Sequence, residues 1–447
     1  MKKNWKRLLA TALAALTICS ALTACGGGDD TQKTKPKDAQ AAQQENPEGV
    51  SEKEKVVLWH LWAGQEAEYV DEAVAAYNAQ SDKYYVESLS VPDAQKIMVA
   101  IQSGNGPDIV DDFSTNIGAY APKGIMLPLD EYIEKTNLDT SDFIPAALES
   151  CKFEGTQYAL PCGINLMALY YNKTLLAEAG YNEPPRTMEE LYEMAVATTK
   201  VNADGTIDVM GFPDFPSVYY MDNFAAALGG GWYDENGKPA TPDNAGNLMA
   251  LKYAVQYREK FGVENVSRFS SSGKYLDPTD PFLAGKQTFR VDGNWMGTNI
   301  KEISKVDLDY GCTFIPYPAD HPEMESRAIV TSSMYYIPAN TKVPDGAFDF
   351  LSFITSQEGN MIQCVSHGSF PAHTSNLSSK EFLEGSYDSD VFAAIAGSPN
   401  LITPPSPEQA GEYGTIIGEE IELAMNLKQT PEEALQKIYD RGSVLFN

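Results

Sequence analysis

The chain has 447 residues with 33 Lys and Arg against 62 Asp and Glu, so its formal net charge is −29. This balance argues against nucleic-acid binding and against docking of a basic patch on an anionic membrane, because both surfaces would repel the chain. Hydrophobic residues make up 43%, a composition typical of a globular protein. The length exceeds that of one ordinary domain and predicts two lobes.

Residues 1–24 have the pattern of a secretory signal. A positively charged start is followed by an apolar run from Leu8 to Ala24, which is too short to be a comfortable membrane span. Small residues then precede Cys25, and this order resembles the lipobox of bacterial lipoproteins, in which the cysteine is lipidated. The alternative interpretation is an ordinary signal peptide with an incidental cysteine.

Residues 25–54 are expected to form a flexible tether. Three glycines open the segment, polar and charged residues dominate the rest, and no aromatic residue occurs in it. Such a composition cannot bury enough apolar surface to fold. A tether that follows a lipid anchor would let a folded protein stand off the membrane.

Short apolar runs then alternate with helical patterns. The spacing predicts a strand at 56–59, a helix over 67–77, a strand at 85–91, a helix capped by Asp93 and ending at Gly104, and a strand at 109–110. This β-α-β-α-β order predicts an α/β fold with a mainly parallel sheet.

The alternation continues through the second half. Further elements are predicted as a strand at 169–171, a helix through Leu175 that ends at Gly180, a strand at 289–291 and a helix over 347–354. Thr187 and Thr430 each begin a capping box, with Glu three residues later, and predict two more helix starts.

The cysteine and histidine residues do not have the spacing of a metal-binding motif. Cys151 and Cys162 flank a predicted hairpin at Glu154–Gly155 at unmatched distances, so buried free thiols are favoured for these and for Cys312 and Cys364. No Cys-x-x-Cys pair and no helical His-x-x-x-His pair occurs, so neither a metal nor another cofactor is expected.

Polar and aromatic residues follow the predicted strands, where ligands bind in open α/β sheets. The candidates are His60, Trp62 and Gln65 after the first strand, Asp112 and Phe113 after the third, and Asp292, Asn294 and Trp295 after the strand at 289–291. Aromatic rings stack on the apolar faces of sugars, while carboxylates and amides bind hydroxyls. Trp232, after three glycines, is either a ligand wall or a surface staple.

Several segments together resemble the extracellular solute-binding proteins of ABC importers, specifically the family 1 group that binds sugars and oligosaccharides. These segments are 59–62, 104–110, 124–130, 158–161, 170–173, 184–187, 282–286, 293–295 and 368–372. Each motif is weak alone, but their number, order and spacing cover residues 55–447.

The resemblance implies a two-lobed clamp that closes on its ligand by hinge motion. The first lobe would comprise 56–162 plus 313–367 and the second 163–312 plus 368–447. The chain would cross between them near 161–163, 312–313 and 368–372.

The same resemblance implies further ligand contacts and partners. Asn165, Ser332, Phe370 and His373 fall where related proteins place cleft residues. The chain would be a monomer that binds a carbohydrate, most plausibly an oligosaccharide, and delivers it to the membrane subunits of a permease. ATP hydrolysis would belong to a separate subunit, because no Gly-x-x-x-x-Gly-Lys-Ser/Thr phosphate loop occurs here. The protein would be exported and anchored on the outer side of the cell membrane.

Two other functions stay open at this stage. The first is binding of a non-sugar solute, such as a polyamine or a glycerol phosphate; the strand-end candidates contain no Lys or Arg for a phosphate. The second is a glycoside hydrolase, which needs two carboxylates on either side of the scissile bond. Asp111 and Asp112 are adjacent in a strand and would point to opposite faces, so we expect no enzyme.

Overall fold

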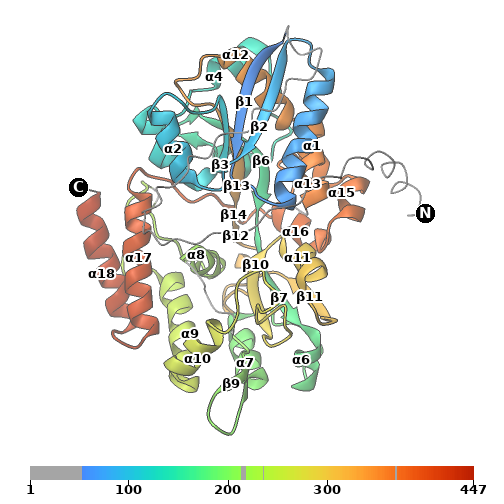
Figure 1. Cartoon of the computed structure of the whole chain (residues 1–447). Coiled ribbons are helices and arrows are strands. Elements are labelled where there is room, and N and C mark those ends of the chain that lie inside the picture. Colours follow the sequence, from blue (N-terminus) through green and yellow to red (C-terminus); the bar gives the residue numbers. More distant parts are fainter. Residues whose placement is uncertain (1–52, 213–217, 235, 368–369, 447) are drawn as a thin grey trace, which may run out of the picture. The chain divides into compact units, whose positions relative to one another are not determined.

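The computed structural model describes residues 53–212, 218–234, 236–367 and 370–446 (Figure 1). The predicted signal, Cys25 and nearly all of the tether lie outside the described residues, as do residues 368–369 of the third predicted crossing. Among the described residues, no helix has both the length and the apolar character needed to cross a membrane.

The larger sheet has five strands in the order β2-β1-β3-β13-β6. Its strands are β1 (Glu54–His60), β2 (Tyr84–Ser90), β3 (Ile109–Phe113), β6 (Ala159–Asn165) and β13 (Thr331–Tyr336). β1 is parallel to β2 and β3, as predicted, but β13 runs antiparallel to both β3 and β6. The parallel prediction is therefore wrong at β13, which arrives from far along the chain rather than through a local helical crossover.

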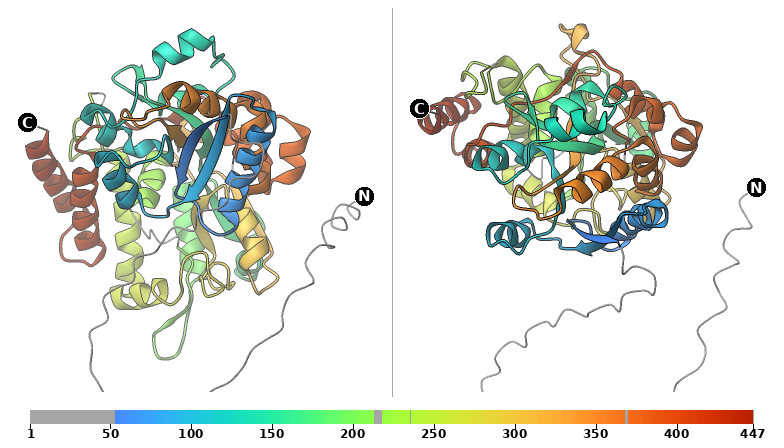
Figure 2. Two further views of the ribbon diagram at one scale, coloured as in Figure 1. Left: turned by 45° about the horizontal axis from the view of Figure 1, so that its top comes forward. Right: turned by 90° about the horizontal axis from the view of Figure 1, so that it is seen from above.

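Helices α1 (Gln65–Gln80), α12 (Pro344–Ile354) and α13 (Gln357–His367) lie along one side of this sheet (Figures 1 and 2). Val56 and Leu58 of β1 are fully buried in the same core as Phe350 and Leu351 of α12. The helix α2 (Ala94–Gln102) begins where predicted, because the Asp93 side chain accepts a hydrogen bond from the Lys96 amide at 3.1 Å.

The smaller sheet has three strands, β10 (Phe289–Gly293), β7 (Met167–Asn172) and β11 (Tyr310–Thr313), with β7 in the centre. Both outer strands are antiparallel to β7, so the parallel prediction is wrong here too. Helix α6 (Lys173–Glu178) follows β7. Only Leu166 separates β6 of the larger sheet from β7 of the smaller one. The chain thus changes sheets after Asn165, a few residues beyond the first predicted crossing.

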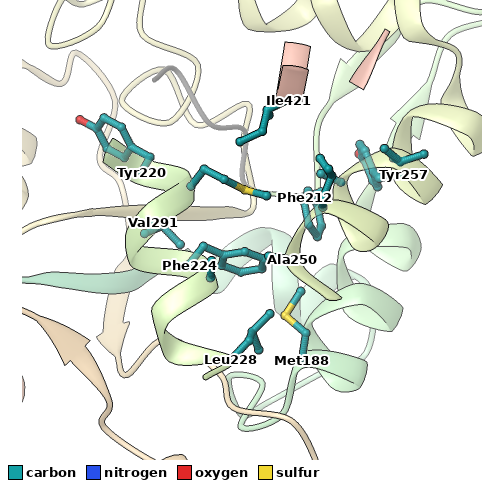
Figure 3. Close-up of a cluster of buried hydrophobic side chains, with 14 of the residues drawn as sticks. Met188, Phe212, Tyr220, Phe224, Leu228, Ala250, Tyr257, Val291 and Ile421 are labelled. Carbon is teal, nitrogen blue, oxygen red and sulfur yellow. The ribbon is translucent and has the colours of Figure 1, made fainter. Parts of the chain in front are cut away.

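A second core packs beside the smaller sheet (Figure 3). It joins Val291 of β10 to α7 (Met188–Thr198), α8 (Val218–Ala227), α9 (Ala245–Phe261) and α17 (Ala410–Met425) through a continuous set of buried side chains. The predicted capping boxes at Thr187, before α7, and at Thr430, before α18 (Pro431–Leu445), are both confirmed.

Short elements connect these layers. The paired strands β12 (Ala328–Ile329) and β14 (Leu401–Ile402) lie between the two larger sheets in Figure 1. The hairpin of β4 (Lys152–Phe153) and β5 (Thr156–Gln157) turns at Glu154–Gly155 as predicted, and β8 (Lys200–Val201) pairs with β9 (Ile207–Val209).

The remaining helices are short. They are η1 (Ser114–Asn116), α3 (Ile117–Tyr120), η2 (Ala121–Lys123), α4 (Asp130–Thr136), α5 (Pro145–Glu149), α10 (Val263–Ser270), α11 (Met296–Ile303), η3 (Pro322–Met324), α14 (Thr374–Leu377), α15 (Lys380–Gly385) and α16 (Ser389–Ala396). Cys151, Cys162 and Cys364 are buried free thiols, and Cys312 is a half-buried one.

Candidate ligand-binding site

A cavity of about 320 Å³ is bordered by η1, α3, α8, α17 and the segment that follows β14. This volume is at the lower end of the range for small-molecule sites. Its polar lining residues are Ser114, Thr115, Asn116, Ser150, Asp222, Thr331, Thr403 and Ser406, and its aromatic ones are Trp232 and Tyr233. Of the residues predicted from the sequence, Trp232 is the one that lines this cavity.

Trp232 forms a fixed wall. Asn247 of α9 binds the preceding turn twice, because its Oδ1 accepts from the Gly231 amide at 2.9 Å and its Nδ2 donates to the Gly231 carbonyl at 2.8 Å. A Cβ at Gly230 would lie 2.4 Å from the same Oδ1, so only glycine fits there. The Tyr413 hydroxyl of α17 donates to the Trp232 carbonyl at 3.2 Å. Trp232 is therefore a buried wall of the cavity and not an exposed side chain on the surface.

Asp222 of α8 faces the same cavity and was missed by the sequence analysis. Its Oδ1 accepts a hydrogen bond from Trp232 Nε1. Burial raises the pKa of Asp222 to about 7, while the Trp232 hydrogen bond opposes that rise. One feature of the sequence could have indicated this residue, because Asp222 is the only charged residue in the apolar helix 218–227.

Hydroxyl groups line another part of the cavity. The Ser114 hydroxyl accepts a hydrogen bond from the Ser332 amide at 2.9 Å, and the Ser150 Oγ lies 3.0 Å from the Ser332 Oγ. The predicted residue Ser332 is thus completely buried behind Ser114 and Ser150, which do line the cavity. Its role in this arrangement is to position their hydroxyls.

The segment 403–407, here called the strap, connects β14 to the residues before α17 and closes one side of the cavity. It is bound to η1 and α3: the Gly118 amide donates to Ser406 Oγ at 3.3 Å, and that hydroxyl donates to the Thr115 carbonyl at 3.0 Å. The approach is close enough that a Cβ at Gly118 would lie 1.6 Å from the Ser406 carbonyl oxygen.

The described residues predicted after β1 and β3 do not line this cavity. His60 is buried, and burial lowers the pKa of its imidazole. The half-buried rings of Trp62 and Phe113 meet edge to face at a centroid distance of 6.0 Å. The Gln65 side chain lies outside the described residues. Asp112 is buried and accepts from Asn116 Nδ2 at 2.8 Å, so it holds a residue that does line the cavity.

Asn165, at the end of β6, is half-buried, and its Nδ2 lies 3.5 Å from Ser333 Oγ. Asn294 is buried and binds the connection between the sheets. Its side-chain Oδ1 accepts a hydrogen bond from the Leu166 backbone amide at 3.0 Å, and its backbone amide donates to the Leu166 carbonyl at 3.2 Å. Asn294 therefore has a structural role at this connection, whereas Asn165 is half-buried at the end of β6.

Asp292, a predicted ligand contact, has its carboxylate hydrogen-bonded within the protein. It is completely buried, and it accepts hydrogen bonds from Arg290 Nε at 2.6 Å, the Tyr275 hydroxyl at 3.1 Å and the Gly293 amide at 2.8 Å. Arg290 also pairs with the buried Asp280 at 2.8 Å. These contacts take up both oxygens of Asp292, so in this structure no direct contact with a ligand is available to it.

Trp295 and Tyr275 form a second aromatic surface. Trp295 is half-buried, and its Nε1 donates to the Tyr275 hydroxyl at 2.8 Å. The Tyr275 ring is 38% exposed, with the Arg290 guanidinium 5.1 Å from its centroid. Tyr275 follows no predicted strand, so its position could not be predicted from the strand pattern.

Phe370 and His373 lie in the core. Phe370 is completely buried between Phe382 and Phe392, with centroid distances of 4.7 and 5.2 Å. The His373 ring lies 4.2 Å from that of Phe143, and its Nε2 is 2.7 Å from the Thr355 carbonyl. The structure thus gives these two predicted site residues packing partners instead of access to a ligand.

The arrangement does not support hydrolysis. Asp111 and Asp112 are both buried, and they accept backbone hydrogen bonds from Leu61 at 2.5 Å and Phe113 at 2.7 Å. Asp222 is the single carboxylate among the described residues that line the cavity, so the pair required for glycoside cleavage is not assembled there. Among the described residues, no cluster of His, Cys, Asp and Glu could hold a metal ion.

Comparison with known proteins identifies the class. Residues 63–361 match the bacterial extracellular solute-binding protein family. The maltotriose-binding protein of Pyrococcus abyssi is 25% identical over 389 residues, which cover 86% of this chain and 81% of that protein. The sn-glycerol-3-phosphate-binding periplasmic protein UgpB of Salmonella typhimurium is 25% identical over 425 residues, covering 88% and 92%.

Solved structures agree with this class. CpMnBP1 with mannotriose bound is 27% identical, with a TM-score of 0.77, over 87% of this chain and 100% of that chain. The Listeria monocytogenes protein Lmo0181 in complex with cycloalternan shares the fold, with a TM-score of 0.75 at 19% identity over 88% and 99% of the two chains.

The chain belongs to the bacterial extracellular solute-binding protein family and has the α/β fold of periplasmic binding proteins. It is the extracellular or periplasmic substrate-binding component of an ABC transporter, and it is not an enzyme. The predictions of fold class, family and transport function are confirmed.

Proposed function

We propose that this protein captures a neutral oligosaccharide and delivers it to the membrane subunits of its transporter. The observation that carries the proposal is the chemistry of the cavity: hydroxyl side chains, the amide of Asn116 and the rings of Trp232 and Tyr233 line it together. Rings of this kind stack on the apolar faces of sugars, while hydroxyls and amides pair with sugar hydroxyls.

The same cavity chemistry favours a sugar over a glycerol phosphate, although relatives of both kinds are similar to the chain. A phosphate is bound most effectively by Arg or Lys. Among the described residues that line the cavity, none is Arg or Lys, and the one charged group is the carboxylate of Asp222. A phosphorylated ligand would therefore be repelled.

The second aromatic surface, formed by Trp295 and Tyr275, would provide a further stacking position. Trp62 and Phe113 at the end of the larger sheet would contribute another one. Several such platforms can serve several sugar rings, which supports an oligosaccharide over a monosaccharide. His60, Gln65 and Asn165 remain proposed as residues around the same ligand.

The proposed topology is that of a lipoprotein. Removal of residues 1–24 would leave Cys25 as the lipidated first residue, and the polar segment up to residue 54 would tether the folded part to the cell membrane. Two lobes with the boundaries predicted from the sequence would close on the ligand, and the closed form would be read by the permease.

The direct test is a thermal-shift screen of residues 53–447 against mannotriose, maltotriose, spermidine and sn-glycerol 3-phosphate, with chromatography of each mixture. A ligand that binds the folded state raises the melting temperature by mass action. A shift with a trisaccharide, without cleavage products, is the expected result. A shift with glycerol phosphate or spermidine alone, or release of smaller sugars, would refute the proposal.

A further inference from the structure

Asp222 differs from every other described residue that lines the cavity, because it alone carries a charge. Its position is well defined. Trp232 Nε1 donates to Oδ1, and Trp232 itself is 6% exposed and fixed through its carbonyl by Ala240 and Tyr413. The hydrogen bond from Trp232 therefore fixes the orientation of the Asp222 carboxyl group.

The second carboxyl oxygen is uncommitted. Among the described residues, none donates a hydrogen bond to Asp222 Oδ2, whereas both carboxyl oxygens of the buried Asp280 and Asp292 receive hydrogen bonds. A carboxylate that is desolvated without a full set of donors is unfavourable. A ligand donor at Oδ2 would remove that deficit.

We propose that Asp222 is a specificity-determining residue of this cavity, whose Oδ2 accepts a hydrogen bond from a hydroxyl of the bound sugar while Trp232 holds Oδ1. This inference rests on the proposed function. It adds a requirement for a hydroxyl donor at one position of the ligand, so a deoxy or O-methylated sugar at that position is rejected.

The ionisation of Asp222 makes this contact dependent on pH. Burial raises its pKa to about 7. The titratable group that faces it is Tyr233, whose own pKa is raised by burial, by Tyr413 of α17 and by Asp222. The charged form is the better acceptor, so affinity rises as the pH increases through 7 and levels off above it. Between pH 6 and pH 8 the ionised fraction, and with it the affinity, increases about tenfold.

The test compares the chain from residue 53 with its Asp222→Asn variant by calorimetric titration of mannotriose and maltotriose from pH 5.5 to 8.5. The amide preserves size and still accepts from Trp232, so folding is expected to be unchanged. The control is Asp208→Asn, which removes one negative charge from an exposed pair with Lys286 outside this cavity. We expect Asp222→Asn to bind at least tenfold more weakly at pH 8 and to lose the pH dependence, and the control to retain both.

A second readout needs no ligand. The indole N–H resonance of Trp232, assigned with a Trp232→Phe variant, should titrate near pH 7 in the wild type and not in Asp222→Asn. Equal affinity of Asp222→Asn and wild type across the pH range, or an indole resonance that does not move, would overturn the inference. So would tighter binding of a glucosamine trisaccharide than of its neutral counterpart, since the partner would then be an amine. Failure of the wild type to bind any neutral sugar would instead overturn the proposed function.

Discussion

Gly118→Ala should separate the strap from the rest of the cavity. The added Cβ would lie 1.6 Å from the Ser406 carbonyl oxygen and 2.9 Å from that of Pro407, whereas ordinary contact begins at 3.4 Å. Because both neighbours are backbone atoms, no side-chain rotation can relieve the overlap. The strap must either move away or remain under strain.

The magnitude follows from the contacts that would be lost. Two hydrogen bonds, from the Gly118 amide to Ser406 and from Ser406 to the Thr115 carbonyl, are worth about 1 kcal/mol each. Overpacking at a site that cannot repack costs about 1–3 kcal/mol. Because Gly118 lies in the four-residue helix α3, the better helix propensity of Ala would stabilise the folded state by at most about 1 kcal/mol. The two costs are alternatives, because a strap that stays docked keeps its hydrogen bonds and a strap that moves away relieves the overlap. The expected loss is therefore about 1–3 kcal/mol in either case.

Urea unfolding and calorimetric titration with the sugar found by the screen distinguish the two responses. If the strap remains docked, its hydrogen bonds are kept, the free energy of unfolding decreases by the overpacking cost, and the affinity is retained. If the strap moves away, stability decreases through the lost hydrogen bonds, and the affinity falls because one wall of the cavity is displaced. Gly397→Ala, at the end of α16, is the control, since its Cβ would meet nothing closer than 3.4 Å and Gly397 does not line the cavity. A Gly118→Ala variant with wild-type stability and affinity would refute this account of the strap.

Three further predictions concern other parts of the molecule. Trp295→Ala should weaken sugar binding more than tenfold while circular dichroism and melting behaviour stay nearly unchanged; unchanged affinity in a titration would remove Trp295 from the site. Asp280→Ala should lower the free energy of unfolding in urea by about 3 kcal/mol, because Arg290 would lose a buried partner; a loss below about 1 kcal/mol would contradict this. Thr187→Ala should cost about 1 kcal/mol by thermal denaturation through loss of the capping box of α7, with the exposed Thr415→Ala in α17 as a comparison that costs little.

Local signals in the sequence predicted most of the early elements correctly. The strands near Val56, Tyr85 and Ile109 and the helix starts at Asp93 and Thr187 depend on neighbouring residues alone, through apolar runs and capping side chains. The direction of β13 could not be predicted in this way, because its partners β3 and β6 lie more than 160 residues earlier in the chain.

The site was harder to predict for a related reason. A strand end identifies a region of the fold, but it does not show whether a side chain is already engaged by the protein. Asp292 lies at the end of a strand as predicted, but its carboxylate is already hydrogen-bonded by Arg290 and Tyr275. Conversely, Asp222 reaches the cavity from the middle of a helix and not from a strand end. Trp232 could be noticed because the glycines before it indicated an unusual turn.

The one-residue connection between the two larger sheets has a mechanical consequence. Asn294 holds both the amide and the carbonyl of Leu166, so this junction has almost no freedom to stretch or slide. A change in the angle between the sheets would therefore turn partly about Leu166, which would act as one pivot among the connections between them. Atoms next to a pivot travel little, and the displacement grows with distance from it. Asn165, which is next to Leu166 in the chain, would therefore nearly keep its position during such a rotation, and a ligand contact made there would be the same before and after it.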